Sequence, residues 1–232
     1  MNPLASLAKR ALKIHQRLLA FYGEPIWRHP LPAIDELVST ILSQNTNDIN
    51  RDRGFNALRA KFPTWEQVRD APTEEVIDAI RPAGLANQKG PRIQQVLHSI
   101  TDERGGLDLS FLADLPVDEA RDWLMRFKGV GPKTAAIVLC FSLGKPAFPV
   151  DTHIYRVTGR IGLRPERMTV EQAHPYLESL FPPEAYYAAH LNLIRLGREI
   201  CTARRAYCER CPIIKLCDYG MERLETGDLP SL

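Results

Sequence analysis

Hydrophobic positions recur at the spacing of α-helices along most of the chain. In residues 3–22, apolar side chains return every three or four positions until Gly23, which predicts an amphipathic helix that ends there. The same spacing predicts further helices with apolar positions at Leu37, Ile41 and Leu42; Phe55, Leu58 and Phe62; Trp65 and Val68; Val76, Ile77 and Ile80; and Ile93, Val96, Leu97 and Ile100. Since no series of strands is visible, the sequence predicts an all-α protein.

A tight turn separates two of these helices near the middle of the chain. The first helix is expected to end near Phe127, and its apolar face consists of Val117, Ala120, Leu124 and Phe127. Residues 128–131, K-G-V-G, contain two glycines that can take backbone angles other residues resist. Pro132 suits the first position of a second helix, because its missing N–H would have had no partner there. Residues 135–141 are all apolar, so this second helix should be buried on most sides.

The start of the second helix can attract anions. Its unpaired N–H groups and the positive end of its dipole favour a phosphate at the turn. Lys133 lies in the same positive field, and that field together with partial burial would favour a neutral, nucleophilic amine. Eighteen residues later comes Asp151. Taken singly, Lys133 is a phosphate contact or a solvated charge, and Asp151 is the cap of a helix that starts at Thr152.

Helices are expected near residues 152–161, 170–180 and 184–200, and a group of cysteines follows them. Cys140 stands alone in the apolar helix and is explained as a small core residue. The group has the spacing C-x6-C-x2-C-x5-C and consists of Cys201, Cys208, Cys211 and Cys217. Disulfides are not expected in a chain without an export signal, so the spacing indicates a metal site. Four thiolates can hold zinc or an iron–sulfur cluster. Residues after Tyr219 show no motif.

The formal net charge is only +2, so any nucleic-acid surface must be local. Between the first two cysteines, Arg204 and Arg205 are either solvated charges or phosphate contacts. A loop fixed by metal at both ends would present them to phosphates at little entropic cost, which favours the second interpretation. Basic residues nearby are Arg195, Arg198 and Arg210. Neither a signal peptide nor a membrane-spanning run is visible, which predicts a cytoplasmic protein, or a nuclear one if the source has a nucleus.

Two segments together, residues 128–135 (KGVGPKTA) and 149–157 (PVDTHIYRV), closely resemble the helix-hairpin-helix DNA glycosylases of the endonuclease III family. The resemblance implies that Lys133 attacks C1′ of the damaged nucleotide and that Asp151 stabilises the sugar cation. It also implies that the hairpin, Lys128, Gly129, Val130 and Gly131, holds the DNA backbone. The cysteine spacing, which follows G-R-E-I-C, resembles the [4Fe-4S] loop of that family, so the resemblance implies a structural cluster on the four cysteines.

Two polar breaks between helices also align with segments that enter the DNA duplex in this family. By composition alone, residues 43–48 are a helix end followed by an N-cap, and Leu85 is an apolar staple beneath a loop. The resemblance implies that Asn45 fills the space left by the extruded nucleotide and that Leu85 wedges against the opposite strand. It adds Gln44 and His153 as DNA contacts. The family more often has glutamine where Asn45 stands and proline where Lys128 stands.

The resemblance implies two helical domains with a DNA-binding cleft between them. A helical barrel should span residues 33–145, and a cluster domain should combine residues 1–32, including a linker around His29, with residues 146–232. The implied function is that of a monomeric bifunctional DNA glycosylase/AP lyase acting on double-stranded damaged DNA. It would remove oxidised pyrimidines such as thymine glycol and cut 3′ to the abasic site by β-elimination. The alternatives are a monofunctional mismatch or adenine glycosylase and a non-catalytic protein that binds damaged DNA.

Overall fold

The computed structural model describes residues 3–26 and 30–228, and it confirms the all-α prediction. Every regular element in these ranges is helical, and the one isolated β-bridge there joins Cys201 to Ala206. The chain divides into two compact units, Met1–Arg28 with Pro146–Leu232, and His29–Lys145. His29 of the expected linker lies outside the described residues. Among the described helices, none combines the length and the apolar character needed to cross a membrane.

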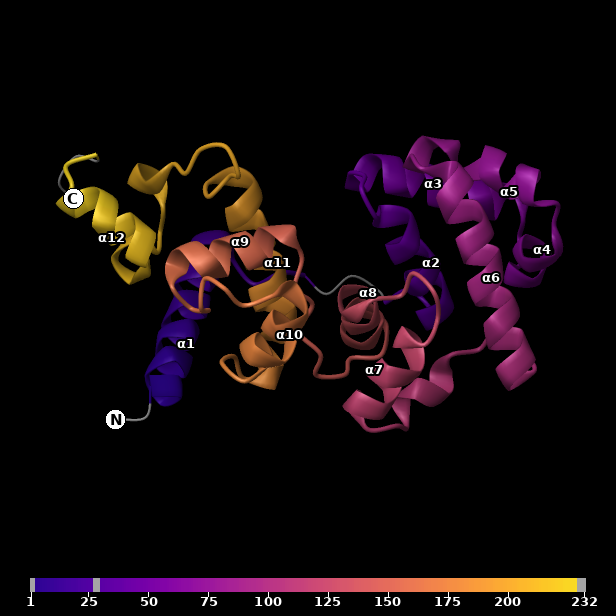
Figure 1. The fold of residues 1–232 in the computed structure, drawn as a ribbon, viewed down its shortest axis with the longest axis horizontal. Coiled ribbons are helices and arrows are strands. Elements are labelled where there is room, and N and C mark those ends of the chain that lie inside the picture. Colours follow the sequence, from indigo (N-terminus) through magenta and orange to yellow (C-terminus); the bar gives the residue numbers. More distant parts are fainter. Residues whose placement is uncertain (1–2, 27–29, 229–232) are drawn as a thin grey trace. The chain divides into compact units, whose positions relative to one another are not determined.

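The unit of residues 29–145 is built around the long helix α6 (Ala86–Arg104), against which α2, α4 and α5 pack (Figure 1). Leu37, Ile41, Leu58, Ile93 and Leu97 are fully buried in its core. The other elements are α2 (Ala33–Ser43), α3 (Asp48–Lys61), α4 (Trp65–Asp70), α5 (Thr73–Ile80), η1 (Arg81–Ala83), η2 (Ser110–Ala113), α7 (Val117–Met125), α8 (Pro132–Ile137) and the π-helical turn η3 (Val138–Ser142). Most of the predicted apolar positions are therefore buried on the inner faces of these helices.

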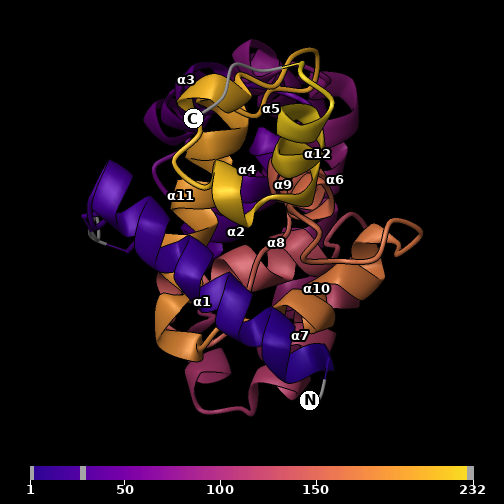
Figure 2. The ribbon, with the colours of Figure 1, turned by 90° about the vertical axis from the view of Figure 1, so that its left-hand side faces the viewer.

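The other unit packs α1 (Pro3–Tyr22) against α11 (Tyr186–Glu199) (Figure 2). Arg10 of α1 donates hydrogen bonds to the carbonyls of Ile161, at 2.6 Å, and Leu216, at 3.0 Å, and pairs with Asp218. These contacts fix the first helix to the last segment of the chain. The remaining elements are α9 (Thr152–Ile161), α10 (Val170–Glu178), η4 (Pro183–Ala185), η5 (Cys208–Arg210), η6 (Ile214–Leu216) and α12 (Asp218–Glu225).

Two features of the fold differ from what the sequence pattern predicts. The apolar helix after Pro132 is regular only as far as Ile137, after which the backbone continues as the π-helical turn η3. The pattern also gave no sign of α12, which begins directly after Cys217. This short helix is stabilised from outside, since Gly220 lies against Ile214 and Arg223 donates to the carbonyl of Ala206 at 3.2 Å.

Candidate active site

The hairpin between α7 and α8 uses its two glycines differently. Gly129 has φ +88°, a conformation that disfavours side chains, and a Cβ there would lie 2.2 Å from Cδ of Arg92. Gly131 does not use the backbone freedom that the sequence offers it. Its backbone is extended, with φ −99° and ψ −178°, and a Cβ would meet no atom within 4 Å. The absence of a side chain at Gly131 instead leaves the N-terminus of α8 open to a ligand.

Lys133 is the second residue of α8, directly after Pro132 as predicted. Its side chain is half-buried, and among the described residues its Nζ donates no hydrogen bond to a carbonyl or carboxylate. The first intrahelical bond runs from the N–H of Ala135 to the carbonyl of Gly131, at 3.0 Å. The N–H groups of Lys133 and Thr134 therefore have no partner within the helix and point out of its start. A primary amine and two free donors share this turn.

Asp151 is 9% exposed and caps α9, which confirms the predicted structural role. Its Oδ1 accepts a hydrogen bond from the backbone N–H of Ile154 at 2.8 Å. Nothing in the described part of the chain donates to Oδ2. One carboxylate oxygen thus orients the group, and the other can accept a cationic or donor group of a ligand.

His153, on the first turn of α9, has Nδ1 3.1 Å from Nη2 of Arg156. Burial lowers the pKa of His153 below its ordinary value, so the ring is neutral near pH 7. Because a guanidinium can only donate, Nδ1 accepts this bond in the tautomer that carries its proton on Nε2, and a hydrogen bond with the backbone of Gly197 acts on the same ring. His153 can therefore donate a hydrogen bond, to a phosphate for example, without carrying charge. Arg156 was not predicted as part of the site.

Asn45 and Leu85 share an unusual backbone conformation. Asn45 has φ 52° and Leu85 has φ 50°. Within residues 3–26 and 30–228, these two are the non-glycine residues with a positive φ. Both side chains are exposed, Leu85 to 46%. Left-handed backbone is unfavourable for leucine and better tolerated by asparagine, and such residues cluster at functional sites. This geometry presents an amide and an apolar side chain to the exterior at the two predicted insertion sites.

Gln44 lies next to Asn45, but its side chain points into the protein. Its Nε2 donates to the carbonyl of Gly129 at 3.1 Å, and its Oε1 accepts from Nη1 of Arg92 at 3.1 Å. The amide therefore ties the α2–α3 turn to the hairpin. DNA contact by Gln44 stays a prediction, while Arg92 is a neighbour that the sequence pattern did not reveal.

The four cysteines of the C-terminal segment have free thiols in one neighbourhood. Burial raises the pKa of Cys211 to about 12 and that of Cys217 to about 11, and the other sulfurs of the group contribute to both shifts. Two arginines that the sequence analysis missed donate to sulfur: Arg160 to Cys201, at 3.3 Å, and Arg223 to Cys208, at 3.8 Å. Such donors stabilise thiolates.

The arrangement of the described cysteines can be compared with what a metal requires. A zinc ion needs its ligand atoms within about 2.3 Å of one point. Within the described ranges, no three His, Cys, Asp or Glu side chains are gathered in this way. An iron–sulfur cluster takes one thiolate for each iron, and the donor set in this segment is four thiols in one neighbourhood.

The loop between the first two cysteines exposes Arg204 and Arg205. The Thr202 hydroxyl accepts from the N–H of Arg205 at 3.1 Å and donates to its carbonyl at 2.6 Å. The guanidinium of Arg205 also lies 4.8 Å from the ring centre of Tyr207. The loop is therefore ordered by its own contacts. By contrast, Arg195 is paired with Glu199 at 2.8 Å, so the basic density expected here is smaller than the count of arginines suggests.

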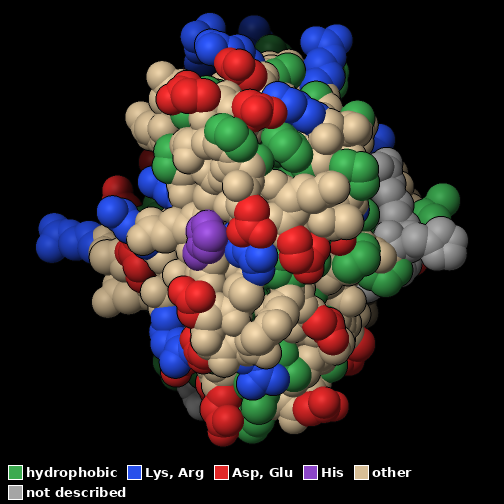
Figure 3. Space-filling view, turned by 90° about the vertical axis from the view of Figure 1, so that its right-hand side faces the viewer, with side chains coloured by type: hydrophobic (Ala, Val, Ile, Leu, Met, Phe, Trp, Pro, Cys, Tyr) green, Lys and Arg blue, Asp and Glu red, His purple; other side chains and the backbone are tan. Residues whose placement is uncertain are grey.

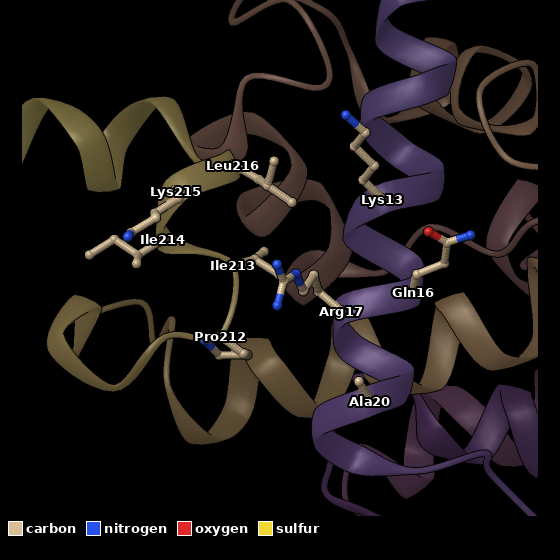
Figure 4. Close-up of a pocket in the computed structure, with 9 residues that line it drawn as sticks. All are labelled: Lys13, Gln16, Arg17, Ala20, Pro212, Ile213, Ile214, Lys215 and Leu216. Carbon is tan, nitrogen blue, oxygen red and sulfur yellow. The ribbon is translucent and has the colours of Figure 1, made fainter. Parts of the chain in front are cut away.

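A pocket of about 810 Å³ lies beside the segment between the last two cysteines (Figure 4). It was not predicted, and it contains none of the predicted site residues. Four residues on one face of α1 and five consecutive residues line it: Lys13, Gln16, Arg17, Ala20, and 212–216. The basic side chains at this pocket are Lys13, Arg17 and Lys215, so it would favour an anionic occupant.

Charge is distributed evenly on one face of the molecule. Figure 3 shows the side that faces right in Figure 1, where acidic and basic side chains are interspersed. A duplex-binding surface needs a local excess of positive charge. This face does not show one.

Comparison with known proteins gives consistent matches. Residues 38–183, which include Lys133 and Asp151 but not the four cysteines, match the sequence model of the HhH-GPD superfamily of base excision DNA repair proteins. A protein of Arabidopsis thaliana named as a DNA glycosylase is 35% identical over 195 residues, covering 80% of this chain and 66% of that protein. Endonuclease III of Sulfolobus acidocaldarius is 33% identical over 191 residues, covering 82% and 83%. The structure of a trapped endonuclease III–DNA covalent intermediate matches with a TM-score of 0.77 and 27% identity, covering 97% of this chain and 100% of that one.

The two hairpin glycines allow a matched test. We expect Gly129→Ala to lower the free energy of unfolding by about 1–2 kcal/mol, because φ +88° is unfavourable for alanine. Arg92 would also have to move away from the new methyl group. Gly131→Ala should change that free energy by no more than about 0.5 kcal/mol, since its backbone is extended and its surroundings are open.

Urea unfolding and DNA binding, measured on both variants, check this expectation. A methyl group at Gly131 would stand where a phosphate approaches, so Gly131→Ala should bind DNA more weakly while remaining as stable as the parent. Equal stability of the two variants would contradict the distinct roles assigned to these glycines.

Proposed function

The chain belongs to the endonuclease III family of the HhH-GPD superfamily of base excision DNA repair proteins, and we propose that it excises oxidised pyrimidines from duplex DNA. It is a DNA N-glycosylase with lyase activity at abasic sites. We further propose that both steps use Lys133, that thymine glycol is one substrate, and that the protein acts as a monomer. We propose that it is associated with the DNA in the cytoplasm or, if the source cell has a nucleus, in the nucleus.

The observation that carries the proposal is the position of Lys133. Its amine is half-buried at the start of α8, with no hydrogen bond to a described carbonyl or carboxylate, beside the free N–H groups of the helix. The N–H groups can hold a phosphate of the damaged strand while the amine attacks the adjoining sugar. An amine without a described protein acceptor is available to a ligand at this turn.

The proposed reaction forms and breaks bonds at one sugar. The nitrogen of Lys133 forms a bond to C1′ while the bond from C1′ to the base breaks, and the base leaves with a proton. One amine proton leaves with the base, and the other passes to O4′ as the bond between C1′ and O4′ breaks, which opens the sugar ring and gives a Schiff base. Removal of a proton from C2′ breaks the bond between C3′ and its phosphate oxygen, which cuts the strand on the 3′ side. Oδ2 of Asp151 stabilises the positive charge that develops at C1′ during base departure.

The other predicted residues handle the DNA. We propose that Asn45 and Leu85 enter the stack from the two segments with left-handed backbone, as the nucleotide is extruded. The ordered Arg204 and Arg205 bind phosphates, and neutral His153 donates from Nε2. Binding would then weaken as salt rises, because counterions are released from each contacted phosphate.

For the cofactor, we propose that Cys201, Cys208, Cys211 and Cys217 hold a [4Fe-4S] cluster. With one thiolate for each iron, its contribution is structural, since no coordination position is left for Lewis-acid chemistry. Arg160 and Arg223 would donate hydrogen bonds to its cysteine sulfurs. The cluster segment would in turn fix the loop that carries Arg204 and Arg205.

Borohydride trapping on a panel of duplexes tests the proposed function. Duplexes carrying thymine glycol, an abasic site, an A·G mismatch or no lesion are incubated with the purified protein and borohydride. We expect covalent complexes and 3′-side cleavage with the first two alone. Base release from the mismatch without a covalent complex would replace the proposal with a monofunctional glycosylase. Binding without any product would leave a protein that only recognises damage.

A further inference from the structure

Lys89 is an unusual residue in the core of the 29–145 unit. It is 1% exposed, and its Nζ donates to the carbonyl of Leu42 at 2.7 Å and to that of Ala83 at 2.8 Å. No described carboxylate pairs with it, and burial lowers the pKa of its amine. Burying such a group is costly, and an apolar side chain of similar size would fill the space without that cost. The role of the Lys89 amine must therefore lie in its hydrogen bonds to these two carbonyls.

Each of these carbonyls lies directly before one insertion segment. Leu42 lies in the last turn of α2, which is followed by the turn at residues 44–47 that carries Asn45, and Ala83 ends η1 just before Gly84 and Leu85. Asn45 and Leu85 are also the described non-glycine residues with positive φ. Such a backbone persists only where surrounding contacts hold it. One ammonium group thus fixes the starting points of both strained segments.

A second residue of α6 extends this arrangement to the hairpin. Arg92 lies one helical turn after Lys89 and so on the same face of α6. Its Nη1 donates to the side chain of Gln44, which in turn donates to the carbonyl of Gly129. The turn that carries Asn45, the turn that carries Leu85 and the hairpin are therefore all tied to one face of α6.

We propose that Lys89 is a positioning residue that holds the segments of Asn45 and Leu85 in their insertion conformations, so that both enter the duplex as one unit. The inference rests on the proposed function, because the insertion roles of Asn45 and Leu85 belong to it. Preorganised segments lose less conformational freedom on binding, which favours the distorted, lesion-containing complex. Binding to undamaged duplex, where nothing is inserted, does not need this order.

The test compares Lys89→Met with Lys145→Met. Methionine fills the volume of Lys89 without its donors, which removes the cost of a buried ammonium but leaves the carbonyls of Leu42 and Ala83 without this donor. Lys145 is a matched control, since its Nζ also donates to a backbone carbonyl, that of Ala113 at 2.7 Å, but away from the insertion segments. The probe is a duplex with a tetrahydrofuran abasic analogue opposite 2-aminopurine, whose fluorescence rises when it loses stacking.

We expect Lys89→Met to weaken binding to this probe about tenfold. This is the loss expected if both segments are in their insertion conformations in only about one molecule in ten. The fluorescence rise should be reduced and binding to undamaged duplex should stay near that of the parent, while the thermal midpoint falls because two buried carbonyls lose their donor. Lys145→Met should match the parent in every readout. If Lys89→Met does not fold, Lys89→Gln, which retains donors on a shorter side chain, should give a smaller loss in the same direction.

Two further variants separate this inference from the proposed function. Asn45→Ala and Leu85→Ala must each lower the fluorescence rise if these residues enter the duplex. If they do, and Lys89→Met or its glutamine substitute equals the parent, the positioning role of Lys89 is overturned. If neither variant lowers the fluorescence rise, the result contradicts the insertion roles of Asn45 and Leu85 in the proposed function, not the role of Lys89 alone. Equal weakening on damaged and undamaged duplex by Lys89→Met would also overturn the proposal.

Discussion

Replacing Lys133 by glutamine is expected to abolish the borohydride-trapped complex and to slow strand cleavage at an abasic site by at least about a thousandfold. The glutamine amide is not a nucleophile, and loss of a residue that forms the covalent intermediate has effects of this order or larger. The side chain remains polar and of similar length at the start of α8, so the helix should still form. Single-turnover cleavage and gel analysis of the trapped complex measure both effects.

Lys128→Gln is the matched control, because Lys128 is an exposed lysine of the same hairpin. Each variant loses one positive charge near the proposed phosphate site. Both should therefore bind DNA somewhat more weakly, and the slope of log affinity against log salt should be less steep by about one. Only Lys133→Gln should lose the covalent complex. Trapping of Lys133→Gln at the parental rate would remove this residue from the nucleophilic role.

Asp151→Asn is expected to slow base removal by about a hundredfold to a thousandfold, corresponding to about 2.7–4 kcal/mol of lost transition-state stabilisation. The substitution removes the negative charge but keeps an acceptor oxygen for the N–H of Ile154. Asparagine caps helices about as well as aspartate, so the free energy of unfolding should change little. Base release in a single turnover, together with urea unfolding, checks both halves of this expectation.

Asp151→Ala distinguishes the two roles of this carboxylate. It removes the cap as well as the charge, so it should lower the free energy of unfolding by about 0.5–2 kcal/mol and slow base removal at least as much as Asp151→Asn. If Asp151→Asn releases the base as fast as the parent, the charge has no catalytic role. Asp151 would then be only the N-cap of α9.

Much of the secondary structure could be predicted from local pattern. The bounds of α1 and α9 agree with the predicted 3–22 and 152–161, because a regular apolar period and a clear terminal residue, Gly23 or Asp151, mark them. The start of α8 at Pro132 follows from the missing N–H of proline in the same way. Where the signal depended on distant contacts, as for α12 and for the π-helical turn after Ile137, the pattern gave no warning.

In the candidate site, too, some residues could be predicted from local sequence and others depend on contacts between distant residues. Lys133, Asp151 and the four cysteines could be proposed because the segments that carry them resemble those of a known family. The neighbours that orient them could not be predicted in this way. Arg160 and Arg223 reach cysteine sulfurs from other helices, and their positions in the sequence give no sign of it. Hydrogen bonds between residues far apart depend on packing, which periodicity does not describe.

The sequence by itself determined the helical class, the hairpin, the residues proposed to react and the cysteine spacing, because each depends on residues close together in the chain. Only the tertiary structure decided that Gln44 turns inward to Gly129, and that Gly131 has an ordinary backbone. It alone brought the buried amine of Lys89 to the carbonyls that precede Asn45 and Leu85. A lysine in a helix reads as a solvated charge until packing excludes water from it, so its partners become defined only when the helices pack.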